Sequence, residues 1–148
     1  MIPSIVTATL EHLDDLVPLF DAYRVFYKQQ SDLSKARSFL RERMYLGEST
    51  IFMAYVDEKA VAFTQLFPCF SSTTTQRLWI LNDLYVAPEL RGKRIGSHLI
   101  GKAKEFAREF GAEGLSLATH VTNTSGQKLY EREGFKRDDE YLQYFFAF

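Results

Sequence analysis

The chain has 148 residues, of which 46% are hydrophobic, 25% charged and 15% aromatic, with a formal net charge of −1. This length predicts one domain over residues 1–148, with enough chain to bury a substantial core. The near-neutral charge argues against broad nucleic-acid binding, which needs clustered Lys and Arg.

A single cysteine, Cys69, excludes an internal disulfide and is typical of a reducing compartment, so a cytoplasmic location is expected. The N-terminal residues lack the charged and apolar regions of a signal peptide. No run of about 18 apolar residues is present, so no membrane span is expected. The three histidines are far apart in the sequence, and no metal site is expected.

In the first half of the chain, apolar periodicity predicts a strand, two helices and a hairpin of two strands. They cover residues 2–10, 11–27, 32–45, 51–56 and 60–67. Pro18 predicts a start or a kink in the first helix, and Asp32 or Ser34 is expected to cap the second.

The second half begins with a polar loop at 71–76 and a long apolar strand at 78–86. A helix opened by Ser97 and stopped at Gly111 follows, then a strand at 115–119, a short helix at 124–133 and a last strand at 141–148. A short extra strand near Phe135 is an option. Because an almost wholly apolar strand needs cover on both faces, the order predicts a three-layer α/β/α fold around a mixed, largely antiparallel sheet.

The segment from Leu81 to Ser97, LNDLYVAPELRGKRIGS, joins a strand to a helix through a basic turn. The first N–H groups of a helix have no intrahelical partner and carry partial positive charge, so they favour a phosphate. The turn is neither a dinucleotide fingerprint nor a Walker A motif. Taken alone, it fits an ordinary solvated turn equally well.

A second motif lies downstream and reads NTSGQKLYEREGF from Asn123 to Phe135. Together the two motifs resemble the GNAT superfamily of acyl-CoA-dependent N-acetyltransferases. That pattern is Arg/Gln-x-x-Gly-x-Gly/Ala after a strand, followed later by Asn…Leu-Tyr-Glu-x-x-Gly-Phe. The resemblance covers residues 51–135 well. The matching residues are Arg91, Gly92, Lys93, Ile95, Gly96, Asn123, Leu129, Tyr130, Glu131, Gly134 and Phe135.

The resemblance implies that the chain binds acetyl-CoA and releases CoA. The strand before the turn would bind the pantetheine arm, the turn the pyrophosphate, and Asn123 and Tyr130 would complete the site. The residues expected to bind are Leu84, Tyr85, Val86, Arg91, Gly92, Lys93, Arg94, Ile95, Gly96, Ser97, Asn123 and Tyr130. Arg94 departs from the family, which has glycine there. Its Cβ could crowd the pyrophosphate, or its guanidinium could pair with a phosphate.

The resemblance also implies two proton-transfer residues. Tyr130 would be the general acid, because its ordinary pKa near 10 suits protonation of a departing thiolate. The alternative for Tyr130 is a core aromatic on a short helix, and that for Asn123 is a helix cap. Asp83 is the candidate base, with a buried structural carboxylate as the alternative. Similar polyamine acetyltransferases carry Glu-Asp where this chain has Asn82-Asp83, and the two side chains share a face only if the strand contains a bulge.

The amine acceptor is expected to meet the first two helices and the loop at 71–76. Residues 23–27 and 81–84 are similar to segments of relatives of the yeast histone and polyamine acetyltransferases. Tyr23, Tyr27 and Phe70 would attract an amine by cation–π contact, with Asn82 and Asp83 beside them. Core packing of these rings is the alternative, and for Phe70 it is the favoured one.

These features predict an N-acetyltransferase that moves acetyl from acetyl-CoA to a primary amine, by direct attack in a ternary complex. The alternatives are a non-catalytic acyl-CoA-binding or regulatory module, and an acetyltransferase for protein lysines or N-termini. The expected partner is a small-molecule or peptide amine, with no nucleic acid and no membrane. The aromatic residues at 141–148 would form a sheet or homodimer surface, with a monomer as the alternative.

Overall fold

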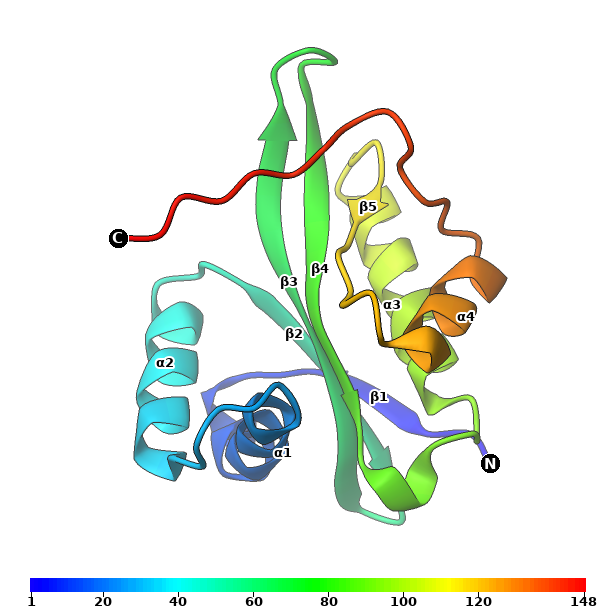
Figure 1. Cartoon of the computed structure of the whole chain (residues 1–148). Coiled ribbons are helices and arrows are strands. Elements are labelled where there is room, and N and C mark those ends of the chain that lie inside the picture. The colour runs from blue at the N-terminus through cyan, green and yellow to red at the C-terminus, as the bar shows by residue number, and fades with distance from the viewer. The chain divides into compact units, whose positions relative to one another are not determined.

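The computed structural model describes residues 1–148, which form two compact units, Met1–Ala118 and Thr119–Phe148. The first unit holds a five-stranded sheet and three α-helices (Figure 1). Its strands are β1 (Ser4–Thr7), β2 (Thr50–Val56), β3 (Lys59–Ser71), β4 (Gln76–Val86) and β5 (Leu115–Ser116). Its α-helices are α1 (Leu13–Phe26), α2 (Leu33–Tyr45) and α3 (Ile95–Glu109), with short 3₁₀ turns η1 (Leu10–His12) and η2 (Pro88–Leu90).

The sheet has the strand order β1-β2-β3-β4-β5 and is mixed. The first four strands are antiparallel to their neighbours, and β5 pairs in parallel with β4 at Trp79 and Ile80. The β2–β3 hairpin turns through Asp57 and Glu58, whose φ angles are 49° and 62°. Two successive left-handed residues give the tight turn that matches the twist of paired strands.

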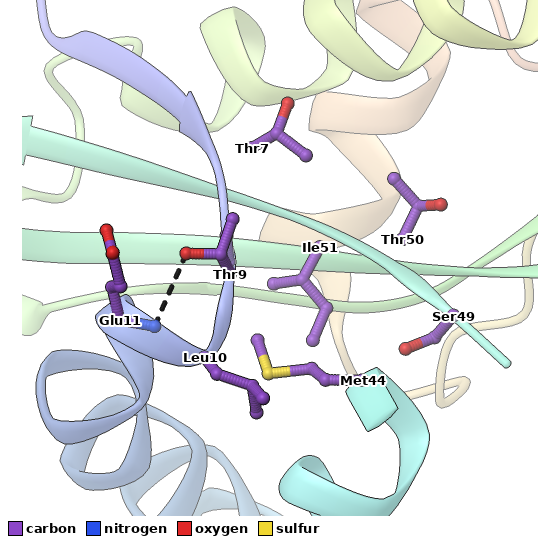
Figure 2. A pocket seen from close by; sticks show the side chains of 9 residues that line it. Thr7, Thr9, Leu10, Glu11, Met44, Ser49, Thr50 and Ile51 are labelled. Atoms are coloured by element: carbon purple, nitrogen blue, oxygen red, sulfur yellow. Dashed lines mark hydrogen bonds between the residues drawn. The ribbon is translucent and has the colours of Figure 1, made fainter. Parts of the chain in front are cut away.

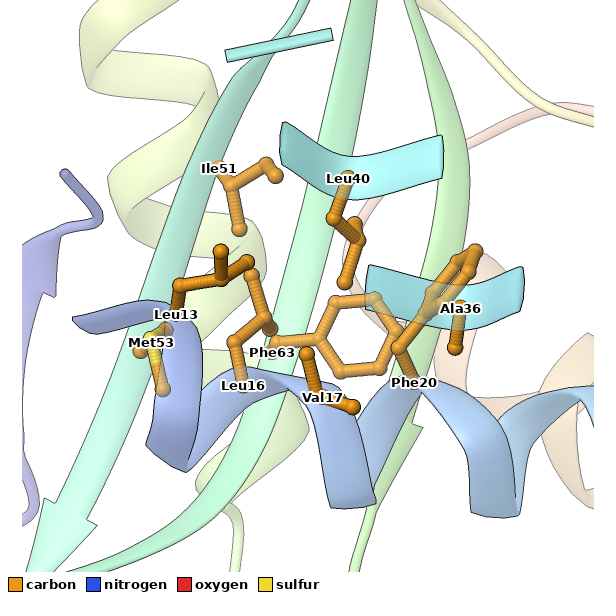
Figure 3. Packing of buried hydrophobic residues seen from close by; sticks show 9 residues of the cluster. All are labelled: Leu13, Leu16, Val17, Phe20, Ala36, Leu40, Ile51, Met53 and Phe63. Atoms are coloured by element: carbon orange, nitrogen blue, oxygen red, sulfur yellow. The ribbon is translucent and has the colours of Figure 1, made fainter. Parts of the chain in front are cut away.

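Helices α1 and α2 cover one face of the sheet, and α3 packs against the other (Figure 1). The core on the α1 side brings apolar residues of both helices onto β2 and β3 (Figure 3). Leu16, Leu40 and Phe63 are fully buried there, which is worth roughly 1.5–3 kcal/mol for each side chain. On the other face, the ring of Phe106 in α3 lies 5.5 Å from Phe52 and 4.9 Å from Trp79.

The local capping of α1 and α2 follows from their sequences. Asp32 caps α2 by accepting a hydrogen bond from Lys35 N at 3.0 Å, as predicted. Pro18 lies inside α1, and the predicted first helix divides into η1 and α1 before it, with Leu13 as the first α-helical residue. The side chain of Thr9 and that of His12 cap η1 reciprocally.

The second unit contains α4 (Thr124–Arg132), which Gly134 follows with a φ of 93°. Residues 133–148 contain no strand. The predicted strand at 141–148 and the optional strand near Phe135 are therefore wrong for the single chain. The strand predicted at 115–119 is also shorter than expected, because only Leu115 and Ser116 pair with β4. None of the helices is both long and apolar enough to cross a membrane.

Candidate active site

A β-bulge in β4 shapes the candidate site. Gln65 of β3 lies opposite Asp83, whereas Leu66 lies opposite Leu81, so Asn82 is the extra residue on β4. A bulge changes the alternation of side chains along a strand. As a result Asn82 and Asp83 interact, with Asn82 Nδ2 donating to Asp83 Oδ1 at 2.8 Å. The strand therefore contains the bulge that Asn82 and Asp83 need in order to share a face.

Asp83 is buried, and several neighbouring side chains donate hydrogen bonds to it. Gln65 Nε2 donates to Asp83 Oδ2, and Thr64 Oγ1 donates to the main-chain oxygen of Asp83 at 2.8 Å. Asn82, which lies next to Asp83 in the sequence, is exposed. Gln65 is fully buried, and its Oε1 has no hydrogen-bond partner in the protein.

Burial raises the pKa of the Asp83 carboxyl, and hydrogen bonds from Gln65, Tyr23 and Asn82 oppose this rise. Desolvation disfavours the charged form of an acid, whereas donors favour it. The net effect is a carboxylate with more affinity for a proton than an exposed aspartate has. A stronger base of this kind is suited to general-base catalysis.

An aromatic group from the end of α1 lies beside this carboxylate. The Tyr23 hydroxyl is 3.5 Å from the main-chain oxygen of Asn82, and the Tyr23 ring packs edge-on against Phe63 at 5.8 Å. The ring centres of Tyr27 and Tyr23 are 5.1 Å apart, and Tyr27 is exposed. The structure thus brings together Tyr23, Asn82 and Asp83, with Tyr27 at the solvent side.

Phe70 does not belong to this group. It lies five residues beyond Gln65 on β3, which is roughly 17 Å at the usual rise of a strand. Its ring is covered by the guanidinium of Arg77 at 4.7 Å. The three-ring amine wall predicted from sequence is therefore reduced to Tyr23 and Tyr27.

The edge of β4 that follows Asp83 is open. β5 pairs with β4 only at Trp79 and Ile80, so residues 81–86 have no strand on that side. Ala87 N donates to Val61 O at 2.8 Å, which makes Val86 and Ala62 a pair without mutual hydrogen bonds. Because hydrogen bonds alternate along an antiparallel pair, the N–H groups of Leu84 and Val86 point to the open edge.

The basic turn leads from this edge to the N-terminus of α3. Gly92 and Arg94 have φ angles of 78° and 64°. Arg94 is the N-cap of α3, and its side chain makes no capping hydrogen bond. The helix begins at Ile95, two residues before the predicted start at Ser97. The start of α3, with exposed Lys93 and Arg94 beside it, supplies backbone donors and positive charge that fit a pyrophosphate.

The left-handed backbone at Arg94 gives a conformational reason for glycine at this motif position. A non-glycine residue in that region costs roughly 1–2 kcal/mol. This backbone strain adds to the two effects expected from the sequence, crowding by the Cβ and pairing of the guanidinium with a phosphate. In this chain the backbone at Arg94 is strained, and the exposed Arg94 side chain places a positive charge at the start of α3.

Arg91 has a structural position in addition to its place in the motif. Its Nε donates to Val86 O at 2.9 Å. Its guanidinium lies 5.4 Å from the centre of the Tyr85 ring and 5.7 Å from that of Phe26. Arg91 therefore ties the turn to β4 and to the end of α1.

In the second unit, Asn123 is the N-cap of α4, which the sequence had offered as its alternative role. Its Oδ1 accepts from Gly126 N at 3.1 Å, and its Nδ2 donates to Thr119 Oγ1 at 3.0 Å. A Cβ at residue 126 would clash with the Asn123 side chain, which explains Gly126. Tyr130 is half-buried on α4, and its ring is 6.0 Å from Phe135.

Gln65 is the residue that the sequence reasoning missed. The signal for it was present, because Thr64-Gln65 is a polar pair within an otherwise apolar strand. Buried polar side chains are usually hydrogen-bonded, so such a pair points to a buried polar partner. Here that partner is Asp83.

A separate hollow of about 580 Å³ lies elsewhere in the first unit, near the ends of β1 and α2 (Figure 2). The buried Oγ of Ser49 has no hydrogen-bond partner there. The hollow contains none of the predicted site residues. It is lined by Thr7, Ala8, Thr9, Leu10, Glu11, Met44, Ser49, Thr50 and Ile51.

The acetyltransferase (GNAT) family model matches residues 13–135. The uncharacterized N-acetyltransferase YhfO of Bacillus subtilis is 42% identical over 129 residues, covering 87% of each chain. Thialysine N-epsilon-acetyltransferase of Caenorhabditis elegans is 26% identical, covering 86% of this chain and 79% of its own.

Among solved structures, a probable acetyltransferase is 45% identical with a TM-score of 0.92, covering 98% of this chain and 97% of its own. An aminoglycoside N-acetyltransferase in complex with CoA has a TM-score of 0.82 at 19% identity, which shows the fold alone; 97% of this chain and 93% of that one are covered. The α/β architecture described above is thus a GNAT fold. The chain belongs to the acetyltransferase (GNAT) family and is an acetyl-CoA-dependent N-acetyltransferase.

Proposed function

We propose that the enzyme acetylates a primary amine of a small molecule by direct attack in a ternary complex, with Asp83 as the base. The observation that carries this proposal is the buried Asp83 carboxylate, next to exposed Asn82 and one residue before the open edge of β4. The proton acceptor and the donor-binding edge are thus neighbours on one strand. The thialysine acetyltransferase relative, whose name gives an ε-amine as acceptor, supports the choice of amine.

The acyl-donor side of the proposal rests on backbone donors. Acetyl-CoA, when bound, supplies the activated acetyl thioester. The N–H groups of Leu84 and Val86 would orient the donor along β4, and that of Val86 would stabilise negative charge on the acetyl oxygen. Residues 91–97, with their positive charge and the backbone N–H groups at the start of α3, would hold the pyrophosphate. The backbone of Tyr85 pairs with Phe63 of β3, so Tyr85 would contribute through its side chain, beside Arg91.

The acceptor side must deal with a protonated amine. An alkyl amine with a pKa near 10.4 is mostly charged at pH 7, which is a handicap of roughly 4–5 kcal/mol. Asp83 would take this proton, directly or through water, because burial raises the pKa of its carboxyl. Tyr23 and Tyr27 would hold the cation by their ring faces before the proton leaves.

Gln65 is proposed as a positioning residue for this base. Its Nε2 donates to Asp83 Oδ2 from a fully buried side chain. This hydrogen bond leaves the Oδ1 side, where exposed Asn82 donates, as the side that faces the acceptor. Gln65 therefore fixes the carboxylate orientation and limits the rise of its pKa.

Tyr130 is proposed as the general acid that returns a proton to the CoA thiolate, with Asn123 hydrogen-bonding the cofactor. The proposal rests on their match to the family motif. Tyr130→Phe should lower turnover by roughly 10²–10⁴-fold with little change in affinity for CoA. An unchanged rate across the pH range would contradict the assignment.

We also propose that residues 1–148 act as one domain, because the family match at 13–135 spans both compact units. A single cooperative melting transition would support it, and two separate transitions would contradict it. The cytoplasmic location and the absence of nucleic-acid partners rest on composition and charge, and they remain predictions.

A screen of CoA-thiol release tests the acceptor. The panel contains polyamines, lysine-like amino acids, aminoglycosides and histone-like peptides, with matched acceptors in which the amine is blocked. We expect turnover with free small amines and none with the blocked ones. Turnover on peptides alone would overturn the small-molecule proposal, and CoA binding without turnover on any acceptor would oppose Asp83 as a base.

A thermal-shift measurement tests the phosphate site. Saturating CoA should raise the melting temperature of the wild type, and Arg91→Glu should abolish the shift. Arg91 also supports β4, so Lys93→Glu serves as a second variant, since Lys93 is exposed in the same turn. An unchanged CoA shift in both variants would contradict this site.

A further inference from the structure

Phe26, the last residue of α1, is an aromatic residue that lies outside the core. It is 52% exposed, and it does not belong to the buried cluster that α1 and α2 form on the sheet. Its ring contacts Tyr27 edge-on, with the ring centres 5.1 Å apart. The Arg91 guanidinium lies over the Phe26 ring, 5.7 Å from its centre. Phe26 therefore brings the end of α1 into contact with the basic turn, although the two are far apart in the sequence.

Three contacts hold the guanidinium of Arg91 in place. Its Nε donates to Val86 O at 2.9 Å, and the centre of the Tyr85 ring lies 5.4 Å away. Together with Phe26, two rings thus lie within the roughly 6 Å over which a ring face attracts a cation. The Nη groups of Arg91 make no hydrogen bond, and no carboxylate is paired with it. The guanidinium is therefore fixed while most of its donors are free.

This arrangement suits the recognition of a phosphate. An arginine side chain loses much rotational freedom when it binds an anion, so a guanidinium that is already fixed loses less. Aromatic rings contact the face of the guanidinium and leave the N–H groups at its edge available for phosphate oxygens. A carboxylate in the same position would also orient Arg91, but it would neutralise the charge and occupy the donors. The two rings orient the guanidinium without either effect.

The position of Arg91 also decides between two roles for the Phe26 ring. Phe26 is next to Tyr27 and close to Tyr23 in α1, so a third ring for the amine acceptor is the alternative role. An ammonium group binds over the face of a ring. At Phe26 the Arg91 guanidinium already lies over the ring, and its positive charge repels a second cation. The ring therefore serves the donor side, and the amine is left with Tyr23 and Tyr27.

We propose that Phe26 is a positioning residue for acetyl-CoA, which together with Tyr85 holds the Arg91 guanidinium where the pyrophosphate binds. This role rests on the proposed phosphate site at residues 91–97. Phe26 itself would not touch the cofactor. Its contribution is the difference between a fixed and a free guanidinium, so it should appear only with ligands that carry the pyrophosphate.

Titration calorimetry with CoA and with pantetheine, which lacks the pyrophosphate, tests this role in the full chain. Phe26→Leu removes the aromatic face and should raise the dissociation constant of CoA by about 2–5-fold, which corresponds to an exposed cation–π contact. The dissociation constant of pantetheine should stay at the wild-type value. Phe26→Trp keeps an aromatic face and should bind CoA as the wild type does. An unchanged constant for CoA in Phe26→Leu, or an equal rise for both ligands, would overturn the proposal.

Phe70→Leu is the matched control. Phe70 is also exposed, and the Arg77 guanidinium lies over its ring at 4.7 Å, but neither residue belongs to the basic turn. The same substitution at this position should leave the dissociation constant of CoA unchanged. A rise as large as that in Phe26→Leu would show that the loss of any exposed ring has this effect, and it would overturn the proposal.

A double-mutant cycle with Arg91→Gln distinguishes a failure of this role from a failure of the phosphate site. Arg91→Gln removes the positive charge and should raise the dissociation constant of CoA, and Phe26→Leu should then add no further rise. Additive effects would show that Phe26 acts independently of Arg91 and would overturn its positioning role. An unchanged constant in Arg91→Gln would contradict the phosphate site itself, and the role of Phe26 with it.

Discussion

Asp21 and Asp83 are both buried carboxylates, 7% and 4% exposed, but their surroundings act in opposite directions. Asp21 accepts hydrogen bonds from Ser31 Oγ at 2.6 Å and Asp32 N at 2.8 Å, and these lower the pKa of its carboxyl. At Asp83, desolvation outweighs the donors, and the pKa rises. The first carboxylate holds the segment between α1 and α2 in place. The second keeps an affinity for protons, which is what a base requires.

The largest expected effect is on activity at Asp83. Asp83→Asn keeps the shape of the side chain but cannot take a proton, so kcat should fall by roughly 10²–10⁴-fold. CoA affinity, measured by its thermal shift, should stay within the wild-type range. Asp21→Asn is the matched control, and the activity of the remaining folded enzyme should be much less affected. An Asp83→Asn enzyme of wild-type kcat would show that the two carboxylates do not differ as described.

The next effect is on stability at Asp21. Asp21→Asn weakens two hydrogen bonds to a charged group and should lower the free energy of unfolding by about 1.5–3 kcal/mol, measured by urea denaturation. Asp14→Asn on the same helix is the control, because Asp14 makes an exposed ion pair with Arg37 at 2.8 Å. That change should cost about 1 kcal/mol or less. A smaller loss for Asp21→Asn than for Asp14→Asn would contradict a structural role for Asp21.

The pH dependence of stability should have opposite signs at the two sites. Asp21 has a lowered pKa, so its contribution is present above the ordinary value near 3.8 and is lost as the pH falls through its folded value. Asp83 has a raised pKa, so its effect runs the other way, and stability is lost as the pH rises from 3.8 through its folded value. Asp83→Asn should therefore gain stability relative to the wild type as the pH rises from the ordinary carboxyl value through the folded pKa of Asp83. A relative loss over this range would mean that the pKa of Asp83 is not raised.

The smallest expected effect is a shift in the pH profile of activity, which should occur in Gln65 variants but not in a variant of its neighbour Thr64. Gln65→Leu removes a donor that lowers the pKa of Asp83, so the acid limb of the kcat/KM profile should move to higher pH. Thr64→Val removes only the hydrogen bond to the Asp83 main-chain oxygen, so it should lower stability by roughly 1–3 kcal/mol and leave the limb in place. Gln65→Asn, with a shorter reach, should fall between Gln65→Leu and the wild type. If the acid limb lies at the same pH in all variants, Gln65 does not tune the pKa of Asp83 and only packs in the core.

Much of this architecture was predictable from local patterns. The apolar stripes of α1, α2 and α3, and the cap at Asp32, are encoded within single segments. The first family motif pointed to the turn between β4 and the start of α3, and the second lies on and around α4. The bulge at Asn82 was not predictable, because it depends on the register between β3 and β4. Its result, a carboxylate oriented by Gln65, arises from residues 18 positions apart in the sequence.

The C-terminal segment failed as a prediction for a related reason. A strand signal in a sequence states that a segment favours extended backbone, but it does not say which strand will be its partner. Within one chain, residues 141–148 find none. Phe70 shows the same limit, since its type suggested an amine wall but its position on β3 puts it against Arg77.

The bond from Arg91 to Val86 O has a consequence for colloidal behaviour. An open strand edge can pair with an extended segment of another chain and start aggregation, and native proteins oppose this with charged side chains at the edge. Arg91 occupies the last carbonyl of the β4 edge and covers it with a guanidinium, so an intruding strand would meet a blocked acceptor and a positive charge. The same side chain that belongs to the phosphate motif thus also makes the end of this edge a poor template for strand addition.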